Sequence, residues 1–160
     1  ALSRATRADD DFAPLDPAVP VAEAADAVGA ALAEAGAEVR LPETLPTVHA
    51  NHGQLVSLFQ NLLANAVKYR DPERPCVITV EGARQGGRAR LAVSDTGSGI
   101  PAEARERIFD PFARLPDTTA EGSGIGLAVC RRIVEHHGGR LWVEDADGGG
   151  ARFVIDLPRA

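Results

Sequence analysis

Two asparagines and a lysine recur at helical spacing within residues 51–69. Asn61, Asn65 and Lys68 occupy positions i, i+4 and i+7, so on a helix their side chains would share one face, opposite an apolar stripe. An amide oxygen is a neutral, hard ligand that suits Mg²⁺, and an ammonium group suits a phosphate charge. The pattern therefore predicts a face for a metal-bound triphosphate, and the alternative is an ordinary solvated helix face.

An acidic residue followed by glycines ends a predicted strand further along the chain. Asp95 begins the run D-T-G-S-G, in which Gly97 and Gly99 allow the backbone to approach a ligand closely. The carboxylate of Asp95 can accept a hydrogen bond from a ligand amine. Glycine-rich turns after strands are common, so a plain turn is the alternative interpretation.

A second glycine-rich run, residues 122–127, opens a predicted helix. The unpaired N–H groups and the positive dipole end of a helix N-terminus favour an anion. The run has no G-K-[ST] ending like a Walker loop, and Gly126 is wrongly spaced for a dinucleotide fingerprint. It predicts a phosphate site of another superfamily, or else a tight turn into a helix.

The run Phe109-Asp110-Pro111-Phe112 lies between the second and the third of these motifs. In type and order, the four segments resemble the N, G1, F and G2 boxes of sensor histidine kinases. The resemblance covers residues 21–158 and includes the G-G-R-L-W-V-E run at 138–144. It implies the ATPase fold that these kinases share with gyrase, mismatch-repair and heat-shock chaperone proteins. It also implies an ATP–Mg²⁺-binding catalytic domain of a two-component system.

The same resemblance assigns roles to residues. Asn65 would coordinate Mg²⁺, Asn61 would help to orient metal or phosphate, and Lys68 would meet the phosphates. Arg114 matches a family position that can reach the γ-phosphate, which completes the predicted catalytic set. The predicted nucleotide contacts are Asn65, Lys68, Tyr69, Asp95, Gly97, Gly99, Ile100, Gly122, Ser123, Gly124, Ile125, Gly126 and Leu127. Among them, Tyr69 would lie against the nucleoside and Asp95 would recognise the adenine amino group.

The elements that must position these residues are predicted from hydrophobic periodicity and turn residues. Together, the predicted helices and strands indicate an α+β domain. We expect a two-layer α/β sandwich with a mixed, mostly antiparallel sheet and helices on one face. Helices are expected over 21–35, 51–69, 101–109 and 127–137, and strands over 37–41, 77–81, 88–95, 140–144 and 152–157. Asn51 with Gln54 resembles a capping box for the second helix. Residues 109–120 lack periodicity and form a candidate lid, with Phe109 and Phe112 as lid anchors or plain core aromatics.

Length and composition restrict the possible classes of protein. A chain of 160 residues suits one domain, with residues 1–20 predicted as a linker and the stump of a dimerisation hairpin, and 21–160 as the ATP-binding domain. A net charge of -6 without Lys/Arg clusters argues against a nucleic-acid partner. No apolar run approaches the roughly 20 residues of a spanning helix, so no direct membrane contact is expected. Cys76 and Cys130 are predicted as packing residues in a reducing cytosol, which implies a cytoplasmic location, although a membrane-attached parent is compatible with it.

The resemblance implies transfer of the γ-phosphoryl group of ATP to a histidine nitrogen. None of His49, His52, His136 and His137 lies in an acidic-flanked acceptor motif. The acceptor is therefore expected on a separate dimerisation domain that is absent from this chain, with a response regulator as the next partner. The parent protein is expected to be a homodimer, and this fragment a monomer that does not autophosphorylate alone.

Two rival functions remain open at this point. One is an anti-sigma-type serine kinase or an ATPase on the same fold, although such proteins usually lack the F box and the run at 138–144. The other is a regulatory or degenerate nucleotide-binding module. The intact Asn65, Asp95 and the glycines of residues 122–126 argue against degeneracy without excluding a regulatory use.

Overall fold

The domain is built on one five-stranded sheet, in which the strands lie in the order β2-β4-β5-β7-β6. The computed structural model describes residues 11–111 and 126–160. The strands are β2 (Glu38–Arg40), β4 (Val77–Gln85), β5 (Arg88–Ser94), β6 (Arg140–Asp145) and β7 (Ala151–Pro158). Strand β2 runs parallel to β4, and all other neighbours are antiparallel. The predicted mixed, mostly antiparallel sheet is confirmed.

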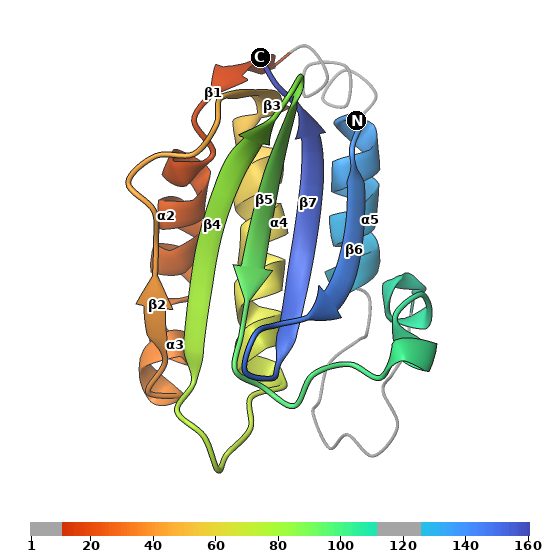
Figure 1. Ribbon diagram of the computed structural model, residues 1–160. Helices are drawn as coiled ribbons and strands as arrows, with labels where there is room; N and C mark the ends of the chain where they lie inside the picture. Colours follow the sequence, from red (N-terminus) through yellow and green to blue (C-terminus); the bar gives the residue numbers. More distant parts are fainter. Residues whose placement is uncertain (1–10, 112–125) are drawn as a thin grey trace.

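Helices cover one face of this sheet, as Figure 1 shows. They are α2 (Ala18–Ala27), α3 (Gly29–Glu34), α4 (His52–Lys68) and α5 (Gly126–His136). No helix of the described residues covers the opposite face (Figure 1). The two-layer α+β sandwich is therefore confirmed.

Helix α4 is the central element of the helical layer. Its buried residues repeat at helical spacing: Leu55, Leu58, Phe59, Leu62, Leu63 and Ala66. At its start, Oδ1 of Asn51 accepts a hydrogen bond from the backbone N–H of Gln54 at 2.9 Å, as the predicted N-cap requires. The helix ends at Lys68, so it carries the predicted polar residues along most of its length.

The core lies between α4 and the inner face of the sheet. The largest fully buried side chains come from both layers, with Phe59 and Leu62 on α4 and with Leu91, Phe153 and Ile155 on β5 and β7. Full burial of such a side chain contributes about 1.5–3 kcal/mol, so this shared core fixes α4 on the sheet. Phe109 is also in the core and meets Phe153 edge to face at 6.2 Å between ring centroids, which favours its reading as a core aromatic.

The prediction of a linker up to residue 20 needs correction for the described residues. β1 (Phe12–Leu15) pairs antiparallel with β3 (Val48–Asn51), and neither strand was predicted. Oδ1 of Asp16 accepts hydrogen bonds from the backbone N–H groups of Ala18 and Leu45. Helix α2 then begins at Ala18, so the folded unit begins before residue 21. Both strands have four residues, too few for a clear alternating pattern.

Two predicted helices differ in detail. The helix expected over 21–35 is divided into α2 and α3 at Val28, where Gly29 costs about 1 kcal/mol relative to alanine in a helix interior. The helix expected over 101–109 is instead two 3₁₀ turns, η1 (Ala102–Ala104) and η2 (Arg107–Phe109). Pro101 has ψ 143°, so it precedes the first turn and does not start an α-helix.

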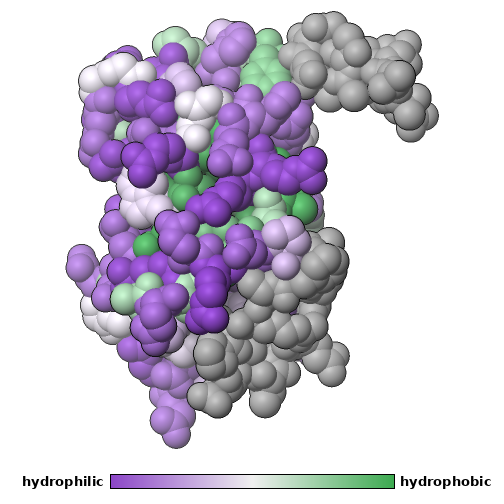
Figure 2. Space-filling model, turned by 90° about the vertical axis from the view of Figure 1, so that its right-hand side faces the viewer, coloured by the Kyte–Doolittle hydropathy of each residue, from purple (hydrophilic) through white to green (hydrophobic). Residues whose placement is uncertain are grey.

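The exposed surface is largely polar over the described residues. Val19 and Leu41 are the large apolar side chains that are exposed, and they lie far apart in the sequence. The side of the molecule drawn in Figure 2 is mostly hydrophilic, and hydrophobic residues show mainly in its central part and at the top. Within the described ranges, no helix is long and apolar enough to cross a membrane.

Candidate functional site

Two segments that carry predicted motifs meet a third, unpredicted segment at one end of the sandwich. The C-terminal end of α4, the loop after β5 and the turn between β6 and β7 lie together in the lower part of Figure 1. Backbone hydrogen bonds join them, since Ser98 N donates to Tyr69 O at 3.2 Å and Asp95 N donates to Ala151 O at 2.9 Å. These bonds join residues that are 29 and 56 positions apart into one small site.

The polar residues of α4 belong to this end of the molecule. Asn61, Asn65 and Lys68 are all half-buried. The Asn61 amide nitrogen donates to the Ser57 carbonyl at 2.8 Å, and a Cβ built on Gly126 would lie 3.0 Å from its Oδ1. The first residue of α5 therefore packs against the amide oxygen of Asn61, which brings two of the predicted motifs into contact.

Asp95 is the most enclosed carboxylate of the site. The residue is only 9% exposed, and Oδ1 accepts hydrogen bonds from Gly97 N at 2.8 Å and from Ala151 N at 3.1 Å. Among the described residues, Oδ2 accepts none. Burial raises the pKa of this carboxyl group, while the hydrogen bonds from Gly97 and Ala151 and the charge of Arg74 lower it. One oxygen is thus fixed by the protein and the other is left to meet a ligand donor.

The glycines around Asp95 are required by close backbone approaches. A Cβ on Gly97 would lie 2.6 Å from the carbonyl oxygen of Tyr69, and Gly99 has a φ of +76°. A Cβ on Gly150 would lie 2.0 Å from the carbonyl oxygen of Asp95. The sequence reasoning missed Gly150, although three consecutive glycines at 148–150 signal a turn with positive φ. Backbone packing at Gly97 and the positive φ at Gly99 thus account for these two glycines, and their contact with a ligand stays a prediction.

The other predicted residues fall into two groups. Lys68 lies beside Tyr69, with Nζ 5.4 Å from the ring centroid, and Ile100 and Leu127 are half-buried against the core. Four predicted nucleotide contacts and one predicted catalytic residue lie outside the described residues: Gly122, Ser123, Gly124, Ile125 and Arg114. The described part of the predicted site therefore consists of Asp95 with its neighbouring glycines and the polar face of α4, and the nucleotide contacts of these residues stay predictions.

Titratable groups elsewhere serve the packing of the domain. Cys76 and Cys130 are free and buried, and burial raises the pKa of the Cys130 thiol to about 12. His137 is 6% exposed, and its ring contacts Phe12 of β1 at 4.6 Å between centroids. Within the described part of the chain, no three His, Cys, Asp or Glu residues gather in a way that could hold a metal ion.

Comparison with known proteins relates this arrangement to a family. The family described as "Histidine kinase-, DNA gyrase B-, and HSP90-like ATPase" matches residues 50–160. Cyanobacterial phytochrome A of Nostoc sp. (strain PCC 7120) is 43% identical over 128 residues, 79% of this chain and 16% of that protein. The adaptive-response sensory kinase SasA of Parasynechococcus marenigrum (strain WH8102) is 42% identical over 120 residues, 74% of this chain and 31% of that protein. The chain therefore spans less than a third of these two relatives.

Solved structures give the same relationship. The mycobacterial sensor histidine kinase MprB superposes with a TM-score of 0.77 at 29% identity, over 92% of this chain and 97% of that chain. Full-length ShkA in complex with AMPPNP also has a TM-score of 0.77, at 34% identity, over 93% of this chain and 31% of that chain. The two-layer fold agrees with these matches. The chain therefore belongs to the histidine kinase-, DNA gyrase B- and HSP90-like ATPase family, as an ATP-binding domain of the histidine kinase type.

Proposed function

We propose that this chain binds ATP with Mg²⁺ and presents the γ-phosphoryl group to a histidine on a separate dimerisation domain of the parent protein. The observation that carries the proposal is the enclosed carboxylate of Asp95, whose Oδ1 is held by two backbone N–H groups while Oδ2 accepts no bond from the described residues. An amino group on a purine ring is the donor that such an oxygen would recognise. The match to full-length ShkA in complex with AMPPNP supports this assignment.

The phosphates would lie along the polar face of α4. The Asn65 side chain is half-buried and makes no hydrogen bond within the described part of the chain, so its amide oxygen is available for a hard cation. Mg²⁺ would neutralise phosphate charge at this position. Lys68 would approach the phosphates from the next turn. Asn61, which donates its amide hydrogen to Ser57, would present its oxygen beside the first residue of α5.

The position of the histidines supports an acceptor outside this chain. All four histidines lie near the N-terminal end of α4: His49 on β3, His52 at the helix start, and His136 and His137 at the end of α5. Asp95 lies at the other end of α4, whose 17 residues span about 25 Å at a rise of about 1.5 Å per residue. None of these rings can reach a phosphoryl group held beside Asn65.

The rest of the proposed reaction follows from the separation of the nucleotide site and the acceptor histidine. Because the nucleotide site and the acceptor would lie on different domains, the chain alone would bind ATP without phosphorylating itself. The parent would act as a cytoplasmic homodimer. The phosphohistidine would then pass its phosphoryl group to an aspartate of a response regulator.

Calorimetric titration of the 160-residue chain with AMPPNP, with and without Mg²⁺, tests the proposal. We expect binding that Mg²⁺ strengthens. A second experiment incubates the chain with radiolabelled ATP and a separately produced dimerisation domain. We expect the radioactive phosphoryl group to appear only on the added domain. No measurable binding of AMPPNP under either condition would refute the proposed function.

A further inference from the structure

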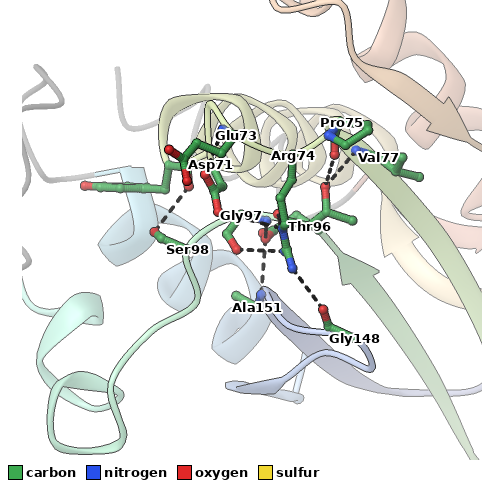
Figure 3. Close-up of polar contacts among 12 residues, drawn as sticks. Asp71, Glu73, Arg74, Pro75, Val77, Thr96, Gly97, Ser98, Gly148 and Ala151 are labelled. Atoms are coloured by element: carbon green, nitrogen blue, oxygen red, sulfur yellow. Dashed lines mark hydrogen bonds and ion pairs between the residues drawn. The ribbon is translucent and has the colours of Figure 1, made fainter.

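We propose that Arg74 is a positioning residue that sets the selectivity of the site for adenine, through the backbone segments that hold the Asp95 carboxylate. This inference rests on the proposed function and extends it to a residue in the loop between α4 and β4 that none of the nucleotide motifs contains. Figure 3 shows the Arg74 side chain reaching from that loop toward Thr96, Gly97 and Gly148.

The Arg74 guanidinium binds three carbonyl oxygens from two separate segments. Nε and Nη2 both donate to the Thr96 carbonyl, the first at 3.1 Å, and Nη2 also donates to the Gly97 carbonyl at 3.1 Å. Nη1 donates to the Gly148 carbonyl at 3.0 Å, in the turn between β6 and β7. The planar, five-donor group of arginine can span such a set, whereas the point charge of lysine cannot.

These carbonyls belong to the segments that carry the two hydrogen-bond donors to Asp95. The Thr96 carbonyl and the Gly97 N–H are the two ends of one peptide group, and that N–H donates to Oδ1 of Asp95 at 2.8 Å. The Gly148 carbonyl lies three residues before Ala151, whose N–H donates to the same oxygen at 3.1 Å. Arg74 therefore binds the peptide group that carries one donor and the turn that leads to the other donor. By holding both segments, it sets the direction in which Oδ2 points.

The rest of the local network places Arg74 itself and the loop that it holds. Oδ2 of Asp71 lies 3.8 Å from Nε of Arg74, and Oδ1 of Asp71 accepts from the Glu73 N–H at 2.9 Å, which closes the loop after α4. The Thr96 hydroxyl donates to the Pro75 carbonyl at 2.6 Å and accepts from Val77 N at 3.0 Å. These contacts attach the Asp95 loop to the start of β4 as well (Figure 3).

Electrostatics support the same role. Burial raises the pKa of Asp95, and the positive charge of Arg74 is among the groups that lower it. An ionised carboxylate is acceptor-only, so it favours a ligand amine and disfavours a ligand carbonyl at the same place. Arg74 thus acts on both the direction and the charge of the recognising group without touching the base.

The test compares two nucleotides that differ at position 6 of the purine, where Oδ2 would act, and in the proton on the adjoining ring nitrogen. We would titrate AMPPNP, which has the adenine amine, and the corresponding imido analogue of ITP, which has a carbonyl oxygen there, into the 160-residue chain. The variants are Arg74→Gln and Arg74→Lys, and melting curves establish that each stays folded. Arg88→Gln is the matched control, because Arg88 also joins separate strands, pairing with Asp156 at 3.1 Å, but is remote from Asp95.

We expect the ratio of the two affinities to fall about tenfold in both Arg74 variants, a loss typical of removing a group that orients a ligand-binding side chain. The Arg88 variant should keep the wild-type ratio even if its melting temperature falls. An unchanged ratio in folded Arg74 variants, or failure of both variants to fold, would overturn the proposal and leave Arg74 with a structural role. Failure of the wild-type chain to bind AMPPNP would instead refute the proposed function.

Discussion

Replacement of Asp95 by asparagine tests nucleotide recognition at a single atom. The amide oxygen of Asn can still accept from Gly97 and Ala151, so the two bonds that hold the side chain are preserved. The other position changes from an acceptor oxygen to an NH₂ donor. A hydrogen bond to a charged acceptor is worth about 1.5–3 kcal/mol, so at about 1.4 kcal/mol per factor of ten we expect AMPPNP to bind about 10- to 150-fold more weakly.

The same substitution should leave the fold intact. Burial raises the pKa of Asp95 in the folded state, so the native state binds more protons than the unfolded state in the window above the ordinary pKa. Its contribution to stability therefore decreases as the pH rises through that window, and the ionised form is a net cost at neutral pH. A neutral amide removes this cost, and we expect the melting temperature at pH 7 to be equal to or higher than that of the wild type.

Calorimetry with AMPPNP and Mg²⁺, together with thermal melting, measures both quantities. Asp156→Asn is the matched control, since it also converts a largely buried carboxylate to an amide but breaks the ion pair with Arg88, at 3.1 Å, far from the site. The control should melt earlier and bind AMPPNP normally. Affinity within about threefold of wild type in a folded Asp95→Asn variant would refute the reasoning.

Three further changes test other parts of the structure. Gly97→Ala places a Cβ 2.6 Å from the Tyr69 carbonyl, so we expect a loss of about 1–3 kcal/mol in urea unfolding and weaker AMPPNP binding, whereas Gly53→Ala, with only an ordinary 3.6 Å contact, should do neither. Asn65→Asp adds a negative charge beside the proposed triphosphate, so binding without Mg²⁺ should weaken by at least about tenfold, and an unaltered response to Mg²⁺ would contradict the metal role. Burial lowers the pKa of His137 from 6.5, and protonation would set its Nε2, which accepts from Asn51 N at 3.1 Å, against that donor. Stability should therefore fall as the pH drops below about 6.5 and level off below the lowered pKa, and urea unfolding at several pH values in the wild type and in His137→Gln should show the difference.

The elements predicted correctly are those with strong local signals. Helix α4 combines an apolar stripe at helical spacing with an Asn51 cap, and α5 ends where Gly138 adopts a φ of +75°. The hairpin of β4 and β5 has Gly86 at a φ of +62° in its turn. In each case the determining contacts lie within a few residues, so spacing and residue type are enough to indicate the structure.

The elements that were missed depend on distant partners. Strand β1 exists because it pairs with β3, some 35 residues later, and the division of a predicted helix at Val28 creates α3. Arg74 has no motif around it, and its role becomes visible only when Thr96 and Gly148 are seen beside it. Pairing and loop contacts of this kind leave little trace in local residue patterns.

The functional groups of the predicted site can be recognised from the amino-acid sequence: the asparagine face, the acidic residue at a strand end, the glycine runs and the family to which they belong. Their order and residue types are enough because phosphate, metal and purine recognition each require particular functional groups. How Asp95 is held becomes visible in the folded chain, where Oδ1 accepts from Gly97 and Ala151 and Arg74 binds the supporting carbonyls. That arrangement joins segments more than 70 residues apart, and its geometry follows from the packing of α4 against the sheet.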